Sequence, residues 1–178
     1  MNTPNKLTVF RFCMIPVIVV VLCLGQFETL WLRIACGLFI IASLTDLLDG
    51  HLARKNNQIT NFGKFMDPLA DKTLVCAVLV ALIEWGLVPA WAVILILTRE
   101  FAISGVRLIA SEKGVVLAAS RIAKFKTNLQ MFWVIALMLH FSWPFWKILT
   151  DVLMWASVVL TLLSFGDYLI KNKDILKD

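Results

Sequence analysis

The chain has 178 residues, of which 60% are hydrophobic and only 16% are charged. Because a soluble domain typically carries about 25% charged residues, this composition excludes a soluble globular enzyme, a disordered chain and a large extramembrane domain. The net charge of +5 is typical of cytoplasmic loops that face anionic lipid headgroups, and no pattern of a nucleic-acid-binding protein accompanies it, so we expect no nucleic-acid partner.

Six apolar stretches follow one another along the chain, each suited to a membrane-spanning helix. They cover residues 10–25, 30–48, 69–83, 89–110, 128–141 and 145–170. Residues 2–11 mix polar and apolar side chains, which predicts a short interfacial helix before the first span. We therefore expect an all-α integral membrane protein with six transmembrane helices. No repeat or low-complexity linker interrupts it, so a single domain over residues 1–178 is the simplest organisation.

The basic residues predict how the chain is oriented in the membrane. An even number of spans places both termini on one side, and all but two of the 17 basic residues fall on that side if Arg99 is assigned to it. The two exceptions are Arg33 and Lys147. By the positive-inside rule, both termini and the long connections face the cytoplasm of a multi-pass cell-membrane protein.

Four of the twelve acidic residues cluster where the second predicted helix ends and the third begins. They are Asp46, Asp49, Asp67 and Asp71. Spacings of three and four residues place each pair on one helix face, so two neighbouring helices would bring four carboxylates together. Their mutual repulsion requires compensation, which Mg²⁺ or Mn²⁺ supplies. The pattern predicts a two-metal centre, and solvated loop charges are a poor alternative because polar groups at membrane depth are costly.

The residues between the aspartates favour a phosphate-bearing ligand. Gly50 and Gly63 leave room for a ligand near the backbone, although a turn or a helix end explains either glycine equally well. Arg54 is able to pair with a phosphate or with one of the carboxylates. Lys64 is a similar candidate, for which simple exposure to solvent is the alternative.

The run from Asp46 to Asp71 matches the pattern DxxDGxxARx8GxxxDxxxD at every fixed position. It resembles the signature of the CDP-alcohol phosphotransferases, which implies six transmembrane helices and an active site at the cytoplasmic surface. The resemblance implies that the four aspartates hold two divalent metal ions and that Asp71 also deprotonates the acceptor hydroxyl. It further implies a set of residues that line the CDP group: Gly50, Ala53, Arg54, Gly63 and Lys64.

A second polar region begins in the fourth predicted helix. Arg99 and Arg107 are eight residues apart, or about 80° around a helix, so they can line one side of a pocket. With Lys124 or Lys126 they would form a cationic site for a dianionic phosphate on the acceptor alcohol. The positive-inside rule explains Arg107 and Lys126 equally well. Glu100 is either a structural partner of a basic residue or a substrate contact.

This region and the amino terminus resemble those of the bacterial phosphatidylglycerophosphate synthases. Residues 99–107 match REFxxxGxR, residues 2–11 match NxPNxLTxxR, and residues 118–127 match AASxxGKxKT except that Ala123 replaces the usual glycine. The resemblance implies transfer of a phosphatidyl group from CDP-diacylglycerol to sn-glycerol 3-phosphate, giving phosphatidylglycerophosphate and CMP in phospholipid biosynthesis. It places Arg99, Arg107 and Lys124 at the acceptor phosphate. A homodimer is expected on the same basis.

The amino-terminal match adds three residues beside the CDP-lipid: Asn5, Thr8 and Arg11. Two alternatives stay open. The same chemistry could use another acceptor, such as inositol phosphate, serine or phosphatidylglycerol. A divalent-cation or proton-coupled transporter would also place carboxylates in a membrane.

Overall fold

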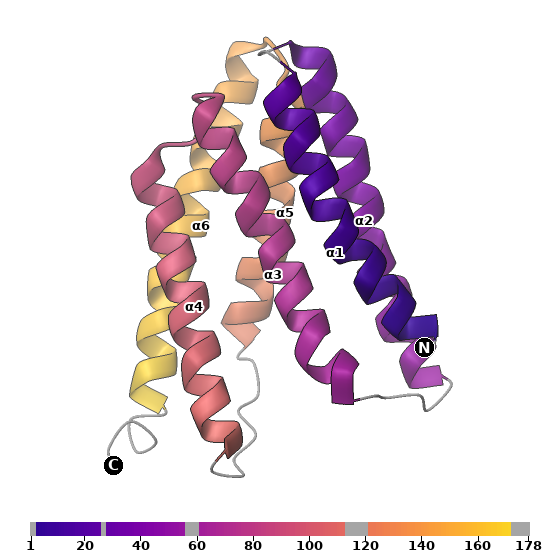
Figure 1. Ribbon diagram of the computed structural model, residues 1–178. Helices are drawn as coiled ribbons and strands as arrows, with labels where there is room; N and C mark the ends of the chain where they lie inside the picture. The colour runs from indigo at the N-terminus through magenta and orange to yellow at the C-terminus, as the bar shows by residue number, and fades with distance from the viewer. Residues whose placement is uncertain (1–2, 26–27, 56–60, 113–120, 172–178) are drawn as a thin grey trace. The chain divides into compact units, whose positions relative to one another are not determined.

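A computed structural model describes the backbone of residues 3–25, 28–55, 61–112 and 121–171. Within these ranges it does not describe the side chains of residues 3–7, 46–55, 61–65, 67–68, 111–112 and 121–122. The described backbone contains six α-helices and no strand, which confirms the all-α prediction (Figure 1). The helices are α1 (Thr3–Leu24), α2 (Thr29–Lys55), α3 (Asn61–Glu84), α4 (Ala90–Glu112), α5 (Arg121–Leu139) and α6 (Pro144–Lys171).

Several helices extend beyond the apolar stretches that predicted them. Helix α2 continues to Lys55, and α3 already begins at Asn61. Leucine, alanine, arginine and lysine in residues 47–55 are good helix formers, so polarity alone does not end the helix there. The interfacial helix expected over residues 2–11 is not a separate element, because the described part of this segment continues as α1 without a break. Its Pro4 lies in the first turn, where proline is tolerated.

Among the described helices, α6 alone is long and apolar enough to cross a membrane by length and composition. It has 28 residues and begins at Pro144, a residue type preferred at the first helical position. Two shorter apolar segments, Thr8–Leu24 and Thr29–Thr45, lie in α1 and α2. Charged residues interrupt the apolar runs of the other helices, so the prediction of six crossings stays a prediction.

The chain divides into two compact units. The first, here called unit 1, comprises Met1–Val88 and Val134–Phe141, and the second, unit 2, comprises Pro89–Trp133 and Ser142–Asp178. In unit 1, α1 packs against both α2 and α3. The Trp85 indole N–H donates to the Leu22 carbonyl over 3.1 Å and so joins the end of α3 to α1. The core of unit 1 consists of large apolar side chains, among them Ile18, Leu22, Phe39, Leu74 and Leu79.

The end of α3 is set by Gly86, which has a φ of 66°. Its N–H donates to the Ile83 carbonyl over 2.9 Å, and the Leu87 N–H donates to the Leu82 carbonyl over 3.2 Å. This pair of hydrogen bonds is a Schellman motif, in which glycine adopts the left-handed conformation without steric cost.

Gly25 provides a first testable prediction, on stability. A Cβ atom at this position would lie 2.6 Å from the Trp31 Cβ, which is close to the backbone and cannot swing away. We expect Gly25→Ala to destabilise the protein by about 1–3 kcal/mol through overpacking. The measurement is thermal unfolding in detergent. Gly37→Ala in α2 is the matched control, because nothing lies within 4 Å of its Cβ and alanine is the better helix former. Equal unfolding temperatures for the two variants would contradict the prediction.

In unit 2, α4 packs against α6. The rings of Trp91 and Trp155 lie 5.5 Å apart between their centroids, one on each helix. The buried side of α6 is mainly polar, with Thr150, Ser157, Thr161, Ser164 and Tyr168 beside the apolar Val158. Buried hydroxyl groups need hydrogen-bond partners, and the hydroxyls of Thr150, Thr161 and Ser164 donate to carbonyls of α6 itself.

Candidate active site

The four aspartates lie on two helices of unit 1 that contact each other. Asp46 and Asp49 are within α2, and Asp67 and Asp71 are within α3. The spacings of three and four residues therefore fall on continuous helix, which places each pair on successive turns of one face. The side chains of Asp46, Asp49 and Asp67 lie outside the described residues. In the part of the chain that the structure does describe, no group of three or more His, Cys, Asp or Glu residues could hold a metal ion.

Asp71 is the one aspartate of the set whose side chain is described, and it is half-buried. Close to the same end of unit 1, Arg11 of α1 is fully buried, and its Nε donates to the Ala42 carbonyl of α2 over 3.3 Å. The Thr45 hydroxyl donates to the same carbonyl over 2.6 Å. Because Ala42 precedes Asp46 by one helical turn, Arg11 fixes α1 to α2 next to the first aspartate of the motif.

Most residues assigned to the CDP-lipid lie outside the described side chains. Thr8, like Arg11, is described and buried on α1. The remaining positions lie within helical backbone whose side chains are not described: Asn5, Gly50, Ala53, Arg54, Gly63 and Lys64. Their assignment to the CDP group stays a prediction.

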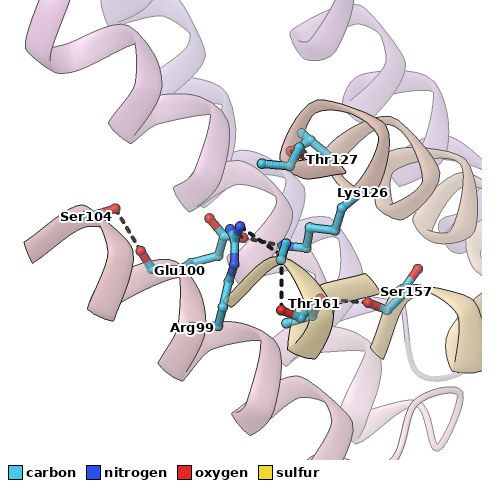
Figure 2. A network of polar contacts seen from close by, with 9 residues as sticks. Arg99, Glu100, Ser104, Lys126, Thr127, Ser157 and Thr161 are labelled. Carbon is cyan, nitrogen blue, oxygen red and sulfur yellow. Dashed lines mark hydrogen bonds and ion pairs between the residues drawn. The ribbon is translucent and has the colours of Figure 1, made fainter. Parts of the chain in front are cut away.

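The four basic residues assigned to the acceptor phosphate lie in unit 2, where two of them, Arg99 and Lys126, form a buried network with Glu100 (Figure 2). Arg99 Nη1 contacts Glu100 Oε1 at 2.8 Å, and the Lys126 Nζ of α5 contacts the same carboxylate oxygen. Arg99 is 7% exposed, Glu100 8% and Lys126 1%. Of the two roles considered for Glu100, the structure therefore supports that of a structural partner, and it pairs with two cations rather than one.

Side-chain hydroxyl groups extend this network along α4 and α6. The Ser104 hydroxyl donates to the Glu100 carbonyl over 2.7 Å, as Figure 2 shows. Arg99 Nη2 donates to the Ser164 hydroxyl of α6 over 3.0 Å. Arg99 Nε is buried and has no hydrogen-bond partner among the described residues. A guanidinium has five N–H donors, so Arg99 retains hydrogen-bonding capacity for a ligand.

Arg107 and Lys124 are less buried than Arg99 and Lys126. Arg107 is half-buried on α4, and its guanidinium carbon lies 6.0 Å from the centroid of the Tyr168 ring of α6. Its Nε is buried without a hydrogen-bond partner among the described residues. Lys124, on α5, is exposed. The four basic positions are thus in one unit, although two of them belong to the buried network.

Two residues of this site were missed from the sequence, Ser164 and Tyr168, each beside an arginine of α4. A signal for them was present. Polar residues recur in the apolar α6 at spacings of four, three and four: Ser157, Thr161, Ser164 and Tyr168. This spacing keeps them on one helix face, which in a membrane-spanning helix indicates a polar partner.

Comparisons with known proteins assign this chain to a family. Residues 1–163 match the family model described as CDP-alcohol phosphatidyltransferase. The chain is 43% identical to the CDP-diacylglycerol--glycerol-3-phosphate 3-phosphatidyltransferase of Bacillus subtilis, over 99% of this chain and 97% of that protein. It is 38% identical to the protein of the same name in Rickettsia typhi, over 94% of both chains. A probable phosphatidylglycerophosphate synthase of Mycobacterium tuberculosis is also 38% identical, over 94% of this chain and 79% of that protein.

These matches confirm the resemblance drawn from the aspartate signature. They cover the acidic helix ends of unit 1 and both arginines of α4. The chain belongs to the CDP-alcohol phosphatidyltransferase family.

Proposed function

We propose that this protein transfers the phosphatidyl group of CDP-diacylglycerol to sn-glycerol 3-phosphate, releasing CMP and phosphatidylglycerophosphate. The observation that carries the proposal is the 43% identity, over nearly the full length, to a relative whose name states this reaction. The complete aspartate signature supports the same chemistry. The enzyme belongs to phospholipid biosynthesis at a membrane.

The acidic end of unit 1 would hold two divalent cations, Mg²⁺ or Mn²⁺. The donor chemistry fits, because these ions prefer carboxylate oxygen and four carboxylates are carried by two helices in contact. Asp46, Asp49, Asp67 and Asp71 would be the ligands. When bound, the cations would neutralise the pyrophosphate charge and stabilise CMP as it leaves.

The protein's own residues would then bind and activate the two substrates. Asp71 would accept the proton of the acceptor hydroxyl as that oxygen attacks the phosphorus of the lipid. A set of residues at the amino terminus and around the aspartates would border the CDP-lipid: Asn5, Thr8, Arg11, Gly50, Ala53, Arg54, Gly63 and Lys64. Arg11 would do so while holding α1 to α2 through the Ala42 carbonyl.

Charge in unit 2 supports an acceptor that carries a phosphate. Arg99, Lys126 and Glu100 are buried together as two cations and one anion, and Arg107 adds a further positive charge on the same helix. Basic side chains gathered in this way favour an anionic ligand. A dianionic phosphate bound by Arg99, Arg107, Lys124 and Lys126 would supply this negative charge, whereas an acceptor without net charge, such as serine, would not.

The membrane arrangement is part of this proposal. All six helices would cross the cell membrane, with both termini and the active site at the cytoplasmic face, and the whole chain would act as one domain. The distribution of basic residues supports this orientation. We further propose that the protein forms a homodimer.

The function is tested with purified protein, CDP-diacylglycerol, Mg²⁺ or Mn²⁺ and a panel of acceptors, with CMP release as the measurement. We expect CMP with glycerol 3-phosphate but not with serine, inositol phosphate or phosphatidylglycerol, and none after chelation of the metal. Release with serine alone would retain the reaction class and reject the acceptor. No release with any acceptor would reject the enzyme and leave the transporter alternative.

Arg107 provides a prediction on acceptor binding. We expect Arg107→Ala to raise the KM for glycerol 3-phosphate by about tenfold or more, as for a lost hydrogen bond to a charged group, and to leave the KM for CDP-diacylglycerol unchanged. The measurement is initial-rate kinetics with each substrate varied in turn. Arg33→Ala is the control, because Arg33 is exposed in unit 1 and lies over the Phe141 ring. An unchanged KM for the acceptor would remove Arg107 from the pocket.

A further inference from the structure

The polar face of α6 has no part in the proposed reaction as described so far. Ser157, Thr161, Ser164 and Tyr168 are all buried, and Ser164 and Tyr168 lie beyond the region matched by the family model. Buried hydroxyl groups in an apolar helix are costly unless they are hydrogen-bonded. Two of these residues contact the arginines of α4, which gives this face a role in the acceptor site.

Ser164 is oriented toward Arg99 by its own helix. Its hydroxyl donates to the Thr161 carbonyl over 3.0 Å, which uses the single hydroxyl proton. The oxygen is thereby left to accept the hydrogen bond from Arg99 Nη2, also at 3.0 Å. Glu100 holds the other terminal nitrogen, Nη1. Because both terminal nitrogens are anchored, the plane of the Arg99 guanidinium is fixed.

Tyr168, one helical turn after Ser164, is the neighbour of Arg107. The guanidinium carbon lies 6.0 Å from the ring centroid, at the limit for a cation–π contact. Tyr168 is 7% exposed, so its ring is a fixed surface beside a side chain that has many rotamers. Arg107 Nε has no hydrogen-bond partner among the described residues, so the contact with the ring helps to restrain this side chain.

We propose that Ser164 and Tyr168 are positioning residues, which hold Arg99 and Arg107 in the orientation that binds the acceptor phosphate. Ser164 acts through a hydrogen bond and Tyr168 through its aromatic ring. The last helix thus determines affinity for the phosphate-bearing acceptor without touching the reacting atoms. This inference rests on the proposed function, because it assigns the arginines to that phosphate.

Ser164 is tested by comparing two substitutions with a matched control in the purified full-length enzyme. We expect Ser164→Ala to raise the KM for glycerol 3-phosphate by about tenfold, the size of one hydrogen bond to a charged group, and to leave the KM for CDP-diacylglycerol within twofold. Ser164→Thr restores the hydroxyl and should recover most of the affinity. Ser157→Ala is the control, because its buried hydroxyl, seven residues earlier on the same face, has no hydrogen-bond partner among the described residues.

Tyr168 is tested by separating its ring from its hydroxyl. We expect Tyr168→Leu to raise the acceptor KM by about threefold, as for loss of a cation–π contact, whereas Tyr168→Phe retains the ring and the affinity. Phe165→Leu, also on α6, controls for loss of an aromatic side chain. Equal KM values for Tyr168→Leu and Tyr168→Phe would overturn the role of the ring.

Thermal unfolding of each variant separates positioning from general stability. A merely structural role would lower the unfolding temperature and kcat while the ratio of the two KM values stays constant, and this result would overturn the proposal. An unchanged acceptor KM in Ser164→Ala would overturn the role of Ser164. These failures differ from failure of the proposed function, in which the unsubstituted enzyme itself releases no CMP with glycerol 3-phosphate.

Discussion

Asp71→Asn should abolish turnover while the protein stays folded. Asparagine retains the size and shape of the side chain but loses the negative charge and the capacity to take a proton from the acceptor hydroxyl. General-base catalysis contributes about 10²–10⁴-fold to a rate, and loss of a metal ligand would add to this, so we expect a decrease of about a thousandfold or more. The measurement is CMP release at saturating concentrations of both substrates, with thermal unfolding as the test of folding.

A control variant and a metal titration distinguish the causes of a lower rate in Asp71→Asn. Asp151→Asn removes an exposed carboxylate at another place in the chain, on α6, and should leave the rate within twofold. A titration with Mn²⁺ separates the two roles of Asp71. If Asp71 were a ligand alone, a high metal concentration would restore the rate, whereas the missing base is not replaced by metal. A wild-type rate in Asp71→Asn would refute both roles.

The helices were predictable where the chain is apolar, because hydrophobic segments of suitable length have few other structures in a membrane. All six predicted helices have a counterpart in the described backbone. Their ends were less predictable. The segment from Asp49 to Lys55 is mainly polar, yet it continues α2, because helix propensity and hydropathy are separate properties of a residue. For the same reason the amino-terminal segment is part of α1.

The identity of the aspartate motif was predictable because its information is local. Spacings of three and four residues have a fixed meaning on a helix, and four carboxylates require compensation wherever they meet. The family assignment confirms the identity of the motif. The aspartates' roles as ligands and base stay predictions, as does the binding of two metal ions.

The basic network was only partly predictable, because its partners are far apart in the sequence. Lys126 and Glu100 are separated by 26 residues, and nothing in the spacing indicates that Lys126 is buried against this carboxylate. Ser164 lies 65 residues after Arg99. Such contacts depend on how α4, α5 and α6 pack, which residue patterns within one helix do not specify. The polar face of α6 indicates that this side of the helix is buried against other polar groups, but it does not identify the residues in contact.

Glu100→Gln should be among the most destabilising single substitutions in unit 2. The carboxylate is the shared partner of Arg99 and Lys126, and all three side chains are buried. Glutamine has nearly the same shape but no charge, so Arg99 and Lys126 would lose the buried carboxylate that they share. Breaking a buried ion pair in this way costs about 3–5 kcal/mol, and we expect a corresponding fall in the unfolding temperature in detergent.

A second substitution tests whether uncompensated charge is the cause. Lys126→Met removes one of the two cations, so the double variant Glu100→Gln, Lys126→Met should be less destabilised than the sum of the single variants. Glu84→Gln on α3 is the matched control, because that carboxylate is exposed and its removal should change stability by less than about 0.5 kcal/mol. If Glu100→Gln unfolds at the same temperature as Glu84→Gln, the network does not stabilise unit 2. If the single effects simply add, the loss arises from packing, since two groups that interact through charge must show coupling.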